Sequence, residues 1–192
     1  MTTDISRIEP VILADGRDAV LRPLVPDDRD RLQVLFSETS ADNLYTRFFG
    51  IGADTVGKHL DHLFSGDPMV ITYLITAGER VLGVVDIERL DHTSAEVAFL
   101  VADDTHGCGV ATLLLERAAA DARSLGIAWF VADVLAVNHL MLQVFADIGF
   151  PVTTHRDGYE VSLRMSTELD VGAREAAARR AASAIAHRPA VR

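Results

Sequence analysis

The chain has 192 residues, of which 49% are hydrophobic and 24% are charged, and its formal net charge is −10. This length and composition favour one soluble globular domain with a substantial core, and no apolar run reaches the length of a membrane span. The acidic balance argues against a nucleic-acid backbone as the main ligand, because phosphate contacts require Lys and Arg. It is compatible with a cationic partner.

The single cysteine, Cys108, excludes an internal disulfide bond and is typical of a reducing compartment. The first ten residues contain neither the basic segment nor the apolar segment of a secretory signal. Together these two features predict a cytoplasmic protein.

The first predicted elements are a hairpin and three helices. Two apolar segments, residues 10–13 and 19–22, flank an Asp-Gly turn and predict the hairpin. Pro26 begins a helix with acidic residues in its first turn, and Ser40 precedes a second helix. A third helix is predicted over residues 55–64.

The third predicted helix carries His59 and His62, which are three positions apart and could in principle share a metal ion. A metal site needs further ligands, and the sequence offers no third ligand nearby. We therefore interpret both residues as solvated histidines and predict no metal.

In the middle of the chain, three strand-like segments predict an antiparallel meander; they are residues 69–75, 80–90 and 96–101. The third segment leads into Gly107 and Gly109, after which an apolar helix begins at Val110. A glycine-rich turn at a helix N-terminus presents free backbone N–H groups to an anion, and the helix dipole adds to the attraction. The turn is therefore a candidate pyrophosphate site, and a tight structural turn is the alternative interpretation.

The rest of the chain predicts a strand, a helix and a final hairpin, which are residues 129–134, 138–148, and 152–155 paired with 159–165. Segment 172–187 is rich in Ala and Arg, which favours a helix but leaves little apolar surface to bury. We therefore predict a globular domain over residues 1–166 and a helical tail or linker over residues 167–192.

Residues 43–50 hold three aromatic side chains beside one arginine; these residues are Tyr45, Arg47, Phe48 and Phe49. The stretch has two interpretations. It is either a core-facing turn or one wall of a substrate cleft.

Three motifs occur in order along the chain: Leu21-Arg22-Pro23-Leu24 followed by Asp27-Asp28, the turn His106-Gly107-Cys108-Gly109-Val110-Ala111, and the Asn138-x-x-Met141 helix that ends in Gly149-Phe150. With these motifs, residues 17–165 resemble the GNAT superfamily of acyl-CoA-dependent N-acetyltransferases. The resemblance implies an α/β (α+β) fold. In it a mixed and mostly antiparallel sheet, flanked by helices, splays around an acyl-CoA cleft.

The resemblance also implies a site for acetyl-CoA as cosubstrate. Backbone N–H groups of residues 107–112 would hold the pyrophosphate, Asn138 would contact the pantetheine arm, and the Leu100 N–H would face the thioester oxygen as an oxyanion donor. The implied acetyl-CoA-binding residues are Leu100, Val101, His106, Gly107, Cys108, Gly109, Val110, Ala111, Thr112, Asn138 and Met141.

The chemistry of acetyl transfer adds the need for a general base. A lysine ε-amine, with a pKa of about 10.4, is almost wholly protonated at neutral pH and must lose a proton before it attacks a thioester. Glu96 lies on the predicted strand among apolar neighbours, whose burial would raise its pKa. The resemblance implies the same role, since the matching glutamate is the base in lysine acetyltransferases of this superfamily. The alternative is an exposed strand carboxylate.

Within the superfamily, residues 44–50 look like bacterial protein lysine acetyltransferases of the Pat type. Those enzymes acetylate an active-site lysine of acyl-CoA synthetases, so the resemblance implies such a protein partner, with Tyr45, Arg47, Phe48 and Phe49 as acceptor-binding residues. Segment 174–185 resembles a linker that leads into a synthetase-like region in some relatives. Two alternatives stay open: an N-acetyltransferase of a small-molecule amine, and a non-catalytic acyl-CoA-binding domain.

Four positions depart from the family pattern. His106 stands where Gln or Arg is usual, Cys108 where Arg is frequent, and Ala111 where Gly is commoner. Losing the cation at position 108 weakens side-chain binding of phosphate, whereas the backbone N–H groups remain. Phe145 replaces a Tyr that protonates the leaving thiolate in many members. Cys108 as a nucleophile and His106 as a base are weaker alternatives, because both would lie at the pyrophosphate end.

Overall fold

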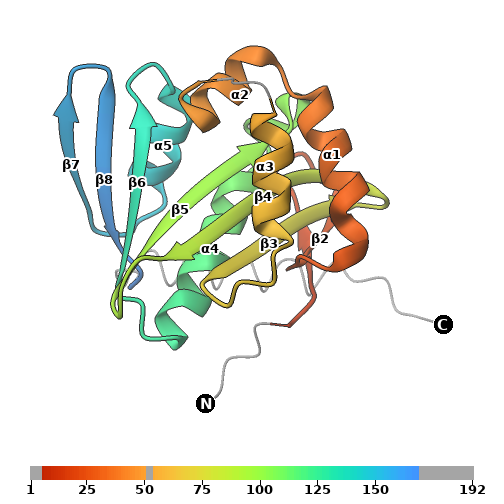
Figure 1. Ribbon diagram of the computed structural model, residues 1–192, viewed down its shortest axis with the longest axis horizontal. Helices are drawn as coiled ribbons and strands as arrows, with labels where there is room; N and C mark the ends of the chain where they lie inside the picture. The colour runs from red at the N-terminus through yellow and green to blue at the C-terminus, as the bar shows by residue number, and fades with distance from the viewer. Residues whose placement is uncertain (1–5, 51–53, 169–192) are drawn as a thin grey trace.

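The computed structural model describes residues 6–50 and 54–168. Their strands form one eight-stranded sheet in the spatial order β1-β2-β3-β4-β5-β6-β8-β7 (Figure 1). In chain order the strands are β1 (Glu9–Ile12), β2 (Asp18–Pro23), β3 (Val70–Ala77), β4 (Arg80–Arg89), β5 (Ser94–Val101), β6 (Trp129–Leu135), β7 (Val152–Asp157) and β8 (Glu160–Ser166). The helices are α1 (Arg29–Glu38), α2 (Ala41–Phe48), α3 (Thr55–Leu63), α4 (Val110–Ser124) and α5 (His139–Asp147).

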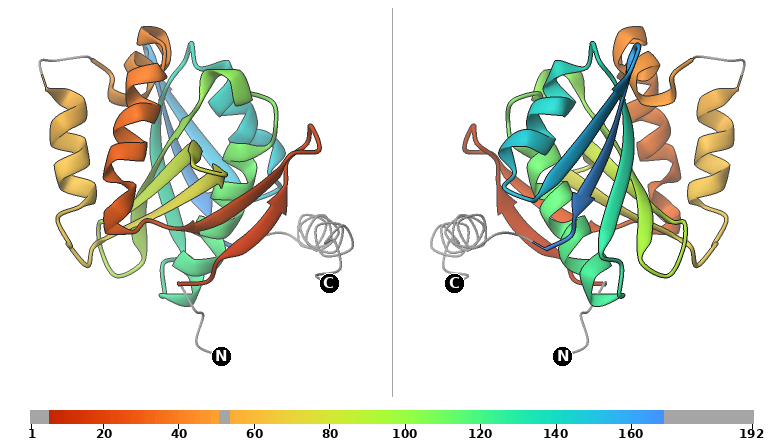
Figure 2. Two further views of the ribbon diagram at one scale, coloured as in Figure 1. Left: turned by 90° about the vertical axis from the view of Figure 1, so that its right-hand side faces the viewer. Right: turned by 90° about the vertical axis from the view of Figure 1, so that its left-hand side faces the viewer.

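Helices cover both faces of the sheet (Figure 2). Helices α1 and α3 lie on one face and α4 lies on the other. Strand β5 supplies side chains to both cores, because successive side chains point to opposite faces. Val97 and Phe99 pack in the core under α4, whereas Leu100 packs in the core under α1 and α3. Helix α2 contacts β5 and β6.

Strands β5 and β6 pair only at their beginnings. Their parallel register joins Ser94 to Trp129 and ends where Glu96 meets Val131. Beyond Glu96, β5 stays paired with β4 and β6 stays paired with β8, so that β5 and β6 diverge (Figure 1). Among the described residues, the divergence leaves each strand with a backbone edge that pairs with no other strand, and it produces the splayed sheet that the family resemblance implied.

A close approach between α4 and β4 positions the loop that follows β5. A Cβ atom at Gly83 of β4 would lie 2.6 Å from the Val110 Cγ1 atom of α4. Glycine at this position therefore allows the first turn of α4 to lie directly on the sheet. The N-terminus of α4 is in this way held beside the diverging strands.

A buried polar network joins α4 to the sheet. The Tyr73 hydroxyl of β3 donates to Asp121 at 2.6 Å, and Arg117 Nε donates to the same carboxylate. The Arg117 guanidinium also lies 4.8 Å from the centroid of the Tyr73 ring. All three side chains are buried. Burial and the hydrogen bond to Asp121 raise the pKa of Tyr73, so its hydroxyl remains a donor at neutral pH.

The structure confirms the predicted fold class and the predicted order of elements. Within the described residues, no helix is long and apolar enough to cross a membrane. The predicted tail lies, from residue 169 onward, outside the described residues and stays a prediction.

The interpretation of His59 as a solvated residue is wrong. Its side chain is 12% exposed and packs edge-on against Phe36 and Phe48, with ring centroids 5.7 and 5.2 Å away. Position 59 belongs to the helical repeat of residues 56, 59, 60 and 63, which turns toward the sheet. His62 lies beside this repeat and is 41% exposed.

Candidate active site

The divergence of β5 and β6 opens a cleft of about 620 Å³, with further walls from α2, α5 and the loop before α4. Most of the predicted site residues line it; they are Arg47, Phe48, Phe49, Glu96, Val101, His106, Gly107, Gly109, Val110, Ala111, Thr112, Asn138 and Met141. The other three predicted residues, Tyr45, Leu100 and Cys108, are described by the structure but lie outside the cleft lining.

The glycine-rich loop presents the N-terminus of α4 to the cleft. Gly107 and Gly109 have φ values of +77° and +83°, and a Cβ atom at either position would meet nothing within 4 Å. The left-handed backbone, rather than crowding, therefore favours glycine here. Gly109 is the N-cap of α4 and has no side chain to accept from the first N–H groups of the helix. Such an uncapped helix end attracts an anion.

The register of β4 and β5 decides which backbone groups of β5 reach the cleft. The Ala102 N–H donates to the Leu82 carbonyl at 2.9 Å, and Leu100 lies opposite Val84 in the same register. Because backbone groups alternate sides along an antiparallel strand, the Leu100 N–H points toward β4. The predicted orientation of Leu100 as an oxyanion donor is therefore wrong, and its side chain is buried under α1 and α3.

By the same alternation, the backbone groups of Phe99 and Val101 form the cleft-facing edge of β5. The Val101 carbonyl accepts from Asn43 Nδ2 at 3.0 Å and lies 3.3 Å from His106 Nε2. Asn43 Nδ2 also donates to Asp103 at 2.8 Å. These bonds join the beginning of α2 to the end of β5, so that both sides of the cleft are fixed to one another.

Glu96 lies where β5 and β6 begin to part, and its exposed carboxylate lines the cleft. Partial desolvation raises its pKa, and the charge of Arg47 opposes that rise. The carboxylates of Glu88, Asp133 and Asp86 raise the pKa further. Glu96 is thus an exposed strand carboxylate whose pKa is nevertheless moved toward neutral pH.

Helix α2 forms one wall of the cleft. Arg47, Phe48 and Phe49 line it, and Phe48 also packs against the core under α1 and α3, so this stretch has features of both interpretations. Tyr45 is 49% exposed and lies outside the lining, so its role in acceptor binding stays a prediction.

Helix α5 forms another wall. Asn138 is its N-cap and accepts from the Met141 N–H at 3.1 Å, which brings these two cleft residues together. Phe145 is buried and meets Phe99 edge-on, with ring centroids 6.1 Å apart. This wall therefore has no proton donor at position 145.

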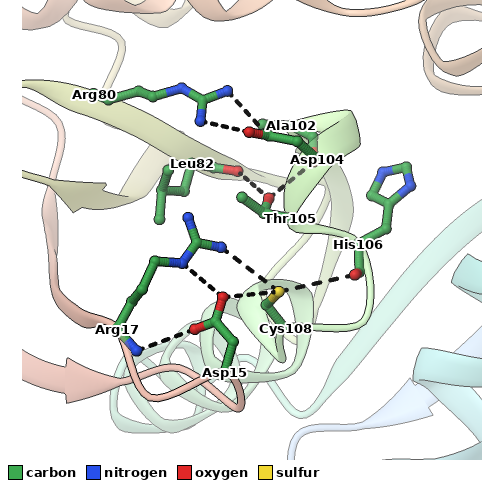
Figure 3. A network of polar contacts seen from close by, with 9 residues as sticks. All are labelled: Asp15, Arg17, Arg80, Leu82, Ala102, Asp104, Thr105, His106 and Cys108. Atoms are coloured by element: carbon green, nitrogen blue, oxygen red, sulfur yellow. Dashed lines mark hydrogen bonds and ion pairs between the residues drawn. The ribbon is translucent and has the colours of Figure 1, made fainter.

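Cys108 faces the hairpin of β1 and β2 (Figure 3). Its carbonyl accepts from the Ala14 N–H at 2.9 Å, and its thiol lies 3.6 Å from Arg17 Nη2. Arg17 also pairs with Asp15 at 2.6 Å. The hairpin therefore brings a guanidinium to the loop at the position where the side chain of Cys108 carries no charge.

A family model for the acetyltransferase (GNAT) domain matches residues 18–151. The chain belongs to the GNAT acetyltransferase family. Acetyltransferase Pat of Mycolicibacterium smegmatis is 31% identical over 145 residues, which are 73% of this chain and 43% of Pat. Acetyltransferase PA5475 of Pseudomonas aeruginosa is 29% identical over 72% of this chain and 77% of that protein. This GNAT chain therefore spans less than half the length of M. smegmatis Pat.

A solved structure supports the same assignment. The GNAT domain of S. lividans PAT is 32% identical and superposes with a TM-score of 0.74, covering 83% of this chain and 96% of that domain. Among the described residues of the present GNAT domain, no group of three His, Cys, Asp or Glu side chains is placed to hold a metal ion.

Several cleft residues of this GNAT domain were not among the predicted site residues; they are Asn43, Thr46, Val97, Ala98, Phe99, Thr105, Ala132, Asp133, Val134, Leu140, Gln143, Val144, Phe145 and Asp147. For two subsets of these residues, the sequence contained a pattern that could have placed them at the site. Leu140, Val144 and Phe145 lie within one helical turn of Met141 on α5, and Asp133 is the charged residue in an otherwise apolar strand. No local sequence pattern could have placed Asn43 at the cleft, because its contact with Val101 joins residues 58 positions apart.

Proposed function

We propose that this GNAT domain transfers an acetyl group from acetyl-CoA to the ε-amino group of a protein lysine, and that an acyl-CoA synthetase is the acceptor. The observation that carries the proposal is the position of Glu96, a cleft carboxylate with a raised pKa at the point where β5 and β6 part. The 32% identity with the GNAT domain of S. lividans PAT supports a Pat-type acceptor.

In the proposed reaction, Glu96 accepts a proton from the lysine ammonium, directly or through a water molecule. The amine lone pair then attacks the thioester carbonyl carbon, the carbon–sulfur bond breaks, and CoA leaves as a thiolate. The second proton, on the nitrogen of the tetrahedral intermediate, passes to water or to the departing thiolate. A raised pKa suits Glu96, because a general base works best when its pKa approaches the working pH. Phe145 gives no proton to the thiolate, which is a good enough leaving group to depart unassisted.

For the donor, we propose that the N–H groups at the beginning of α4 hold the pyrophosphate, while Asn138 and Met141 contact the pantetheine arm. The residues fit this ligand, because Gly107 and Gly109 leave open space before a 15-residue helix. The cleft-facing edge of β5 at Phe99 and Val101, where the Val101 carbonyl already accepts from Asn43, would pair with the pantetheine amides as an added strand does. An N–H group of this edge then replaces that of Leu100 as the oxyanion donor.

The cation that position 108 lacks is, in this proposal, supplied by Arg17. We expect Arg17→Gln to raise the KM for acetyl-CoA about tenfold with little change in kcat, because one charge-assisted contact is worth about 1.4 kcal/mol or more. Steady-state kinetics and calorimetric titration with CoA measure the two effects. Arg123→Gln, which removes the same charge at the other end of α4, should change neither value. An unaltered CoA affinity in Arg17→Gln would contradict this role.

The acceptor is tested by measuring CoA release from acetyl-CoA with a purified acyl-CoA synthetase, in parallel with a panel of small amines. The proposal expects acetylation of one lysine of the synthetase, located by mass spectrometry. Reaction with small amines alone would replace the protein acceptor with a small-molecule one. Tight binding of acetyl-CoA without transfer to either acceptor would show a ligand-binding domain in place of an enzyme.

A further inference from the structure

Arg47, on the α2 wall of the cleft, forms its ion pair with a carboxylate other than Glu96. Its Nη2 atom donates to Asp86 Oδ2 at 2.6 Å, and the two side chains are only 14% and 13% exposed. The guanidinium also lies 5.0 Å from the centroid of the Phe48 ring. Arg47 is therefore held on two sides, by charge and by an aromatic face.

Asp86 and Glu96 lie on the same face of the sheet. Asp86 of β4 is opposite Ala98 of β5, and Glu88 is opposite Glu96. Side chains two positions apart along a strand share a face, so Asp86 is a diagonal neighbour of Glu96 at roughly 7–8 Å. One guanidinium therefore faces two carboxylates and pairs with the more buried of them.

His59 covers the Arg47–Asp86 pair from the side of α3. Its Nε2 atom is 3.8 Å from Asp86 Oδ1, and neither atom has a hydrogen-bond partner among the residues that the structure describes. Burial lowers the pKa of His59, although the charge of Asp86 opposes this effect. The imidazole is accordingly neutral at neutral pH, and Arg47 rather than His59 neutralises Asp86.

We propose that Asp86 is a positioning residue that holds Arg47 away from Glu96 and so leaves the Glu96 carboxylate unpaired as a base. This inference rests on the proposed role of Glu96. A guanidinium paired with Glu96 would stabilise the charged carboxylate and weaken it as a proton acceptor. It would also occupy the oxygens that must receive the lysine proton. Asp86 prevents this pairing because the free-energy cost of removing an ion-pair partner is larger for a buried carboxylate than for an exposed one.

The charged and titratable groups around Glu96 and the Arg47–Asp86 pair come from α2, α3, β4 and β6. They are Arg47 of α2, His59 and His62 of α3, Asp86 and Glu88 of β4, and Asp133 of β6. His62 pairs with Glu88 at 3.1 Å and not with Asp86. Glu88 therefore provides a matched control, since it carries the same charge on the same strand face but does not bind Arg47.

The test begins with Asp86→Asn. We expect kcat for acetyl transfer to fall about tenfold, which is part of the roughly 10²- to 10⁴-fold contribution of a general base. The acid limb of the kcat/KM profile should move to lower pH, because a released Arg47 lowers the pKa of Glu96. Glu88→Gln should shift this limb slightly and leave kcat within about threefold, because the Arg47–Asp86 pair stays intact.

The double variant Asp86→Asn/Arg47→Gln separates positioning from a general loss of charge. It removes the cation that would pair with Glu96, so the acid limb should return to higher pH relative to Asp86→Asn. This variant also removes both halves of the buried pair together, which keeps the test usable if Asp86→Asn does not fold. Equal effects of Asp86→Asn and Glu88→Gln, or no return of the acid limb in the double variant, would overturn the inference.

A measurement without turnover distinguishes failure of this inference from failure of the proposed function. The pKa of the Glu96 carboxyl is measured by ¹³C NMR titration and assigned by the loss of its signal in Glu96→Gln. Loss of either neighbouring carboxylate charge by itself lowers this pKa, so a larger fall in Asp86→Asn than in Glu88→Gln supports the positioning role even if no acceptor is found. An unchanged pKa in Asp86→Asn, in a protein that transfers acetyl groups normally, would leave the proposed function in place and exclude the role of Asp86.

Discussion

Replacement of Glu96 by Gln is expected to lower kcat for acetyl transfer by about 10²- to 10⁴-fold, the usual contribution of a general base. Gln has nearly the same shape, so the cleft and β5 should be preserved, but its amide cannot accept a proton from the lysine ammonium. The affinity for CoA should remain, because the proposed pyrophosphate site at the beginning of α4 is not changed by a substitution on β5. CoA-release kinetics and calorimetric titration with CoA measure the two quantities.

The pH profile of the same variant gives a second result with a definite sign. Partial desolvation raises the pKa of Glu96 above its ordinary value of 4.5, and a base must be deprotonated to act. Activity of the unaltered protein should therefore rise with pH through this raised pKa, so that the acid limb of kcat/KM lies above pH 4.5. In Glu96→Gln this limb should be absent.

The neighbouring carboxylate Glu88 provides the control for this experiment. It lies directly opposite Glu96 on β4, it is exposed, and its removal takes away the same charge. Glu88→Gln should retain kcat within about threefold. If Glu96→Gln retained more than about a tenth of kcat, or if both variants lost activity equally, Glu96 would not be the general base.

Replacement of Arg117 by Met is expected to lower the free energy of unfolding by about 3–5 kcal/mol, the usual cost of removing one partner of a buried ion pair. Met fills much of the same volume, but it leaves the Asp121 carboxylate buried. Within the described residues, the Tyr73 hydroxyl would then be the side-chain group that still donates a hydrogen bond to this carboxylate. Since whole domains are stable by only about 5–15 kcal/mol, this one change removes a large part of the total. Urea denaturation followed by circular dichroism measures it.

Arg123→Met is the matched control for this stability experiment. Arg123 lies on the same helix, is 56% exposed, and approaches Glu168 at 3.8 Å. Its loss should change the free energy of unfolding by less than about 0.5 kcal/mol, as is usual for exposed positions. Equal losses in the two variants would show that the buried network contributes no more than a surface pair.

The secondary structure and its order could be predicted from residue patterns in the sequence, and the general location of the cleft from the family resemblance. Each strand and helix follows from apolar spacing and turn residues that act over a few neighbours, such as the Asp15-Gly16 turn and the glycines before Val110. Glu96 could be identified as a candidate base because it lies among apolar neighbours on a predicted strand and matches the glutamate base of the family it resembles. The raised pKa of Glu96 is due partly to carboxylates on neighbouring strands. The order of the strands alone does not predict that these carboxylates lie near Glu96.

The tertiary structure decided the contacts that depend on register and on which helix covers which face. The direction of the Leu100 N–H follows from its pairing with Val84, which one residue of slip would reverse. Arg47 reaches Asp86 across 39 positions and Arg17 reaches Cys108 across 91, and neither pair has a local sequence signal. Local patterns therefore determined the elements and the candidate base. The packing of distant strands and helices determined which charges surround that base, because such contacts exist only once the chain is folded.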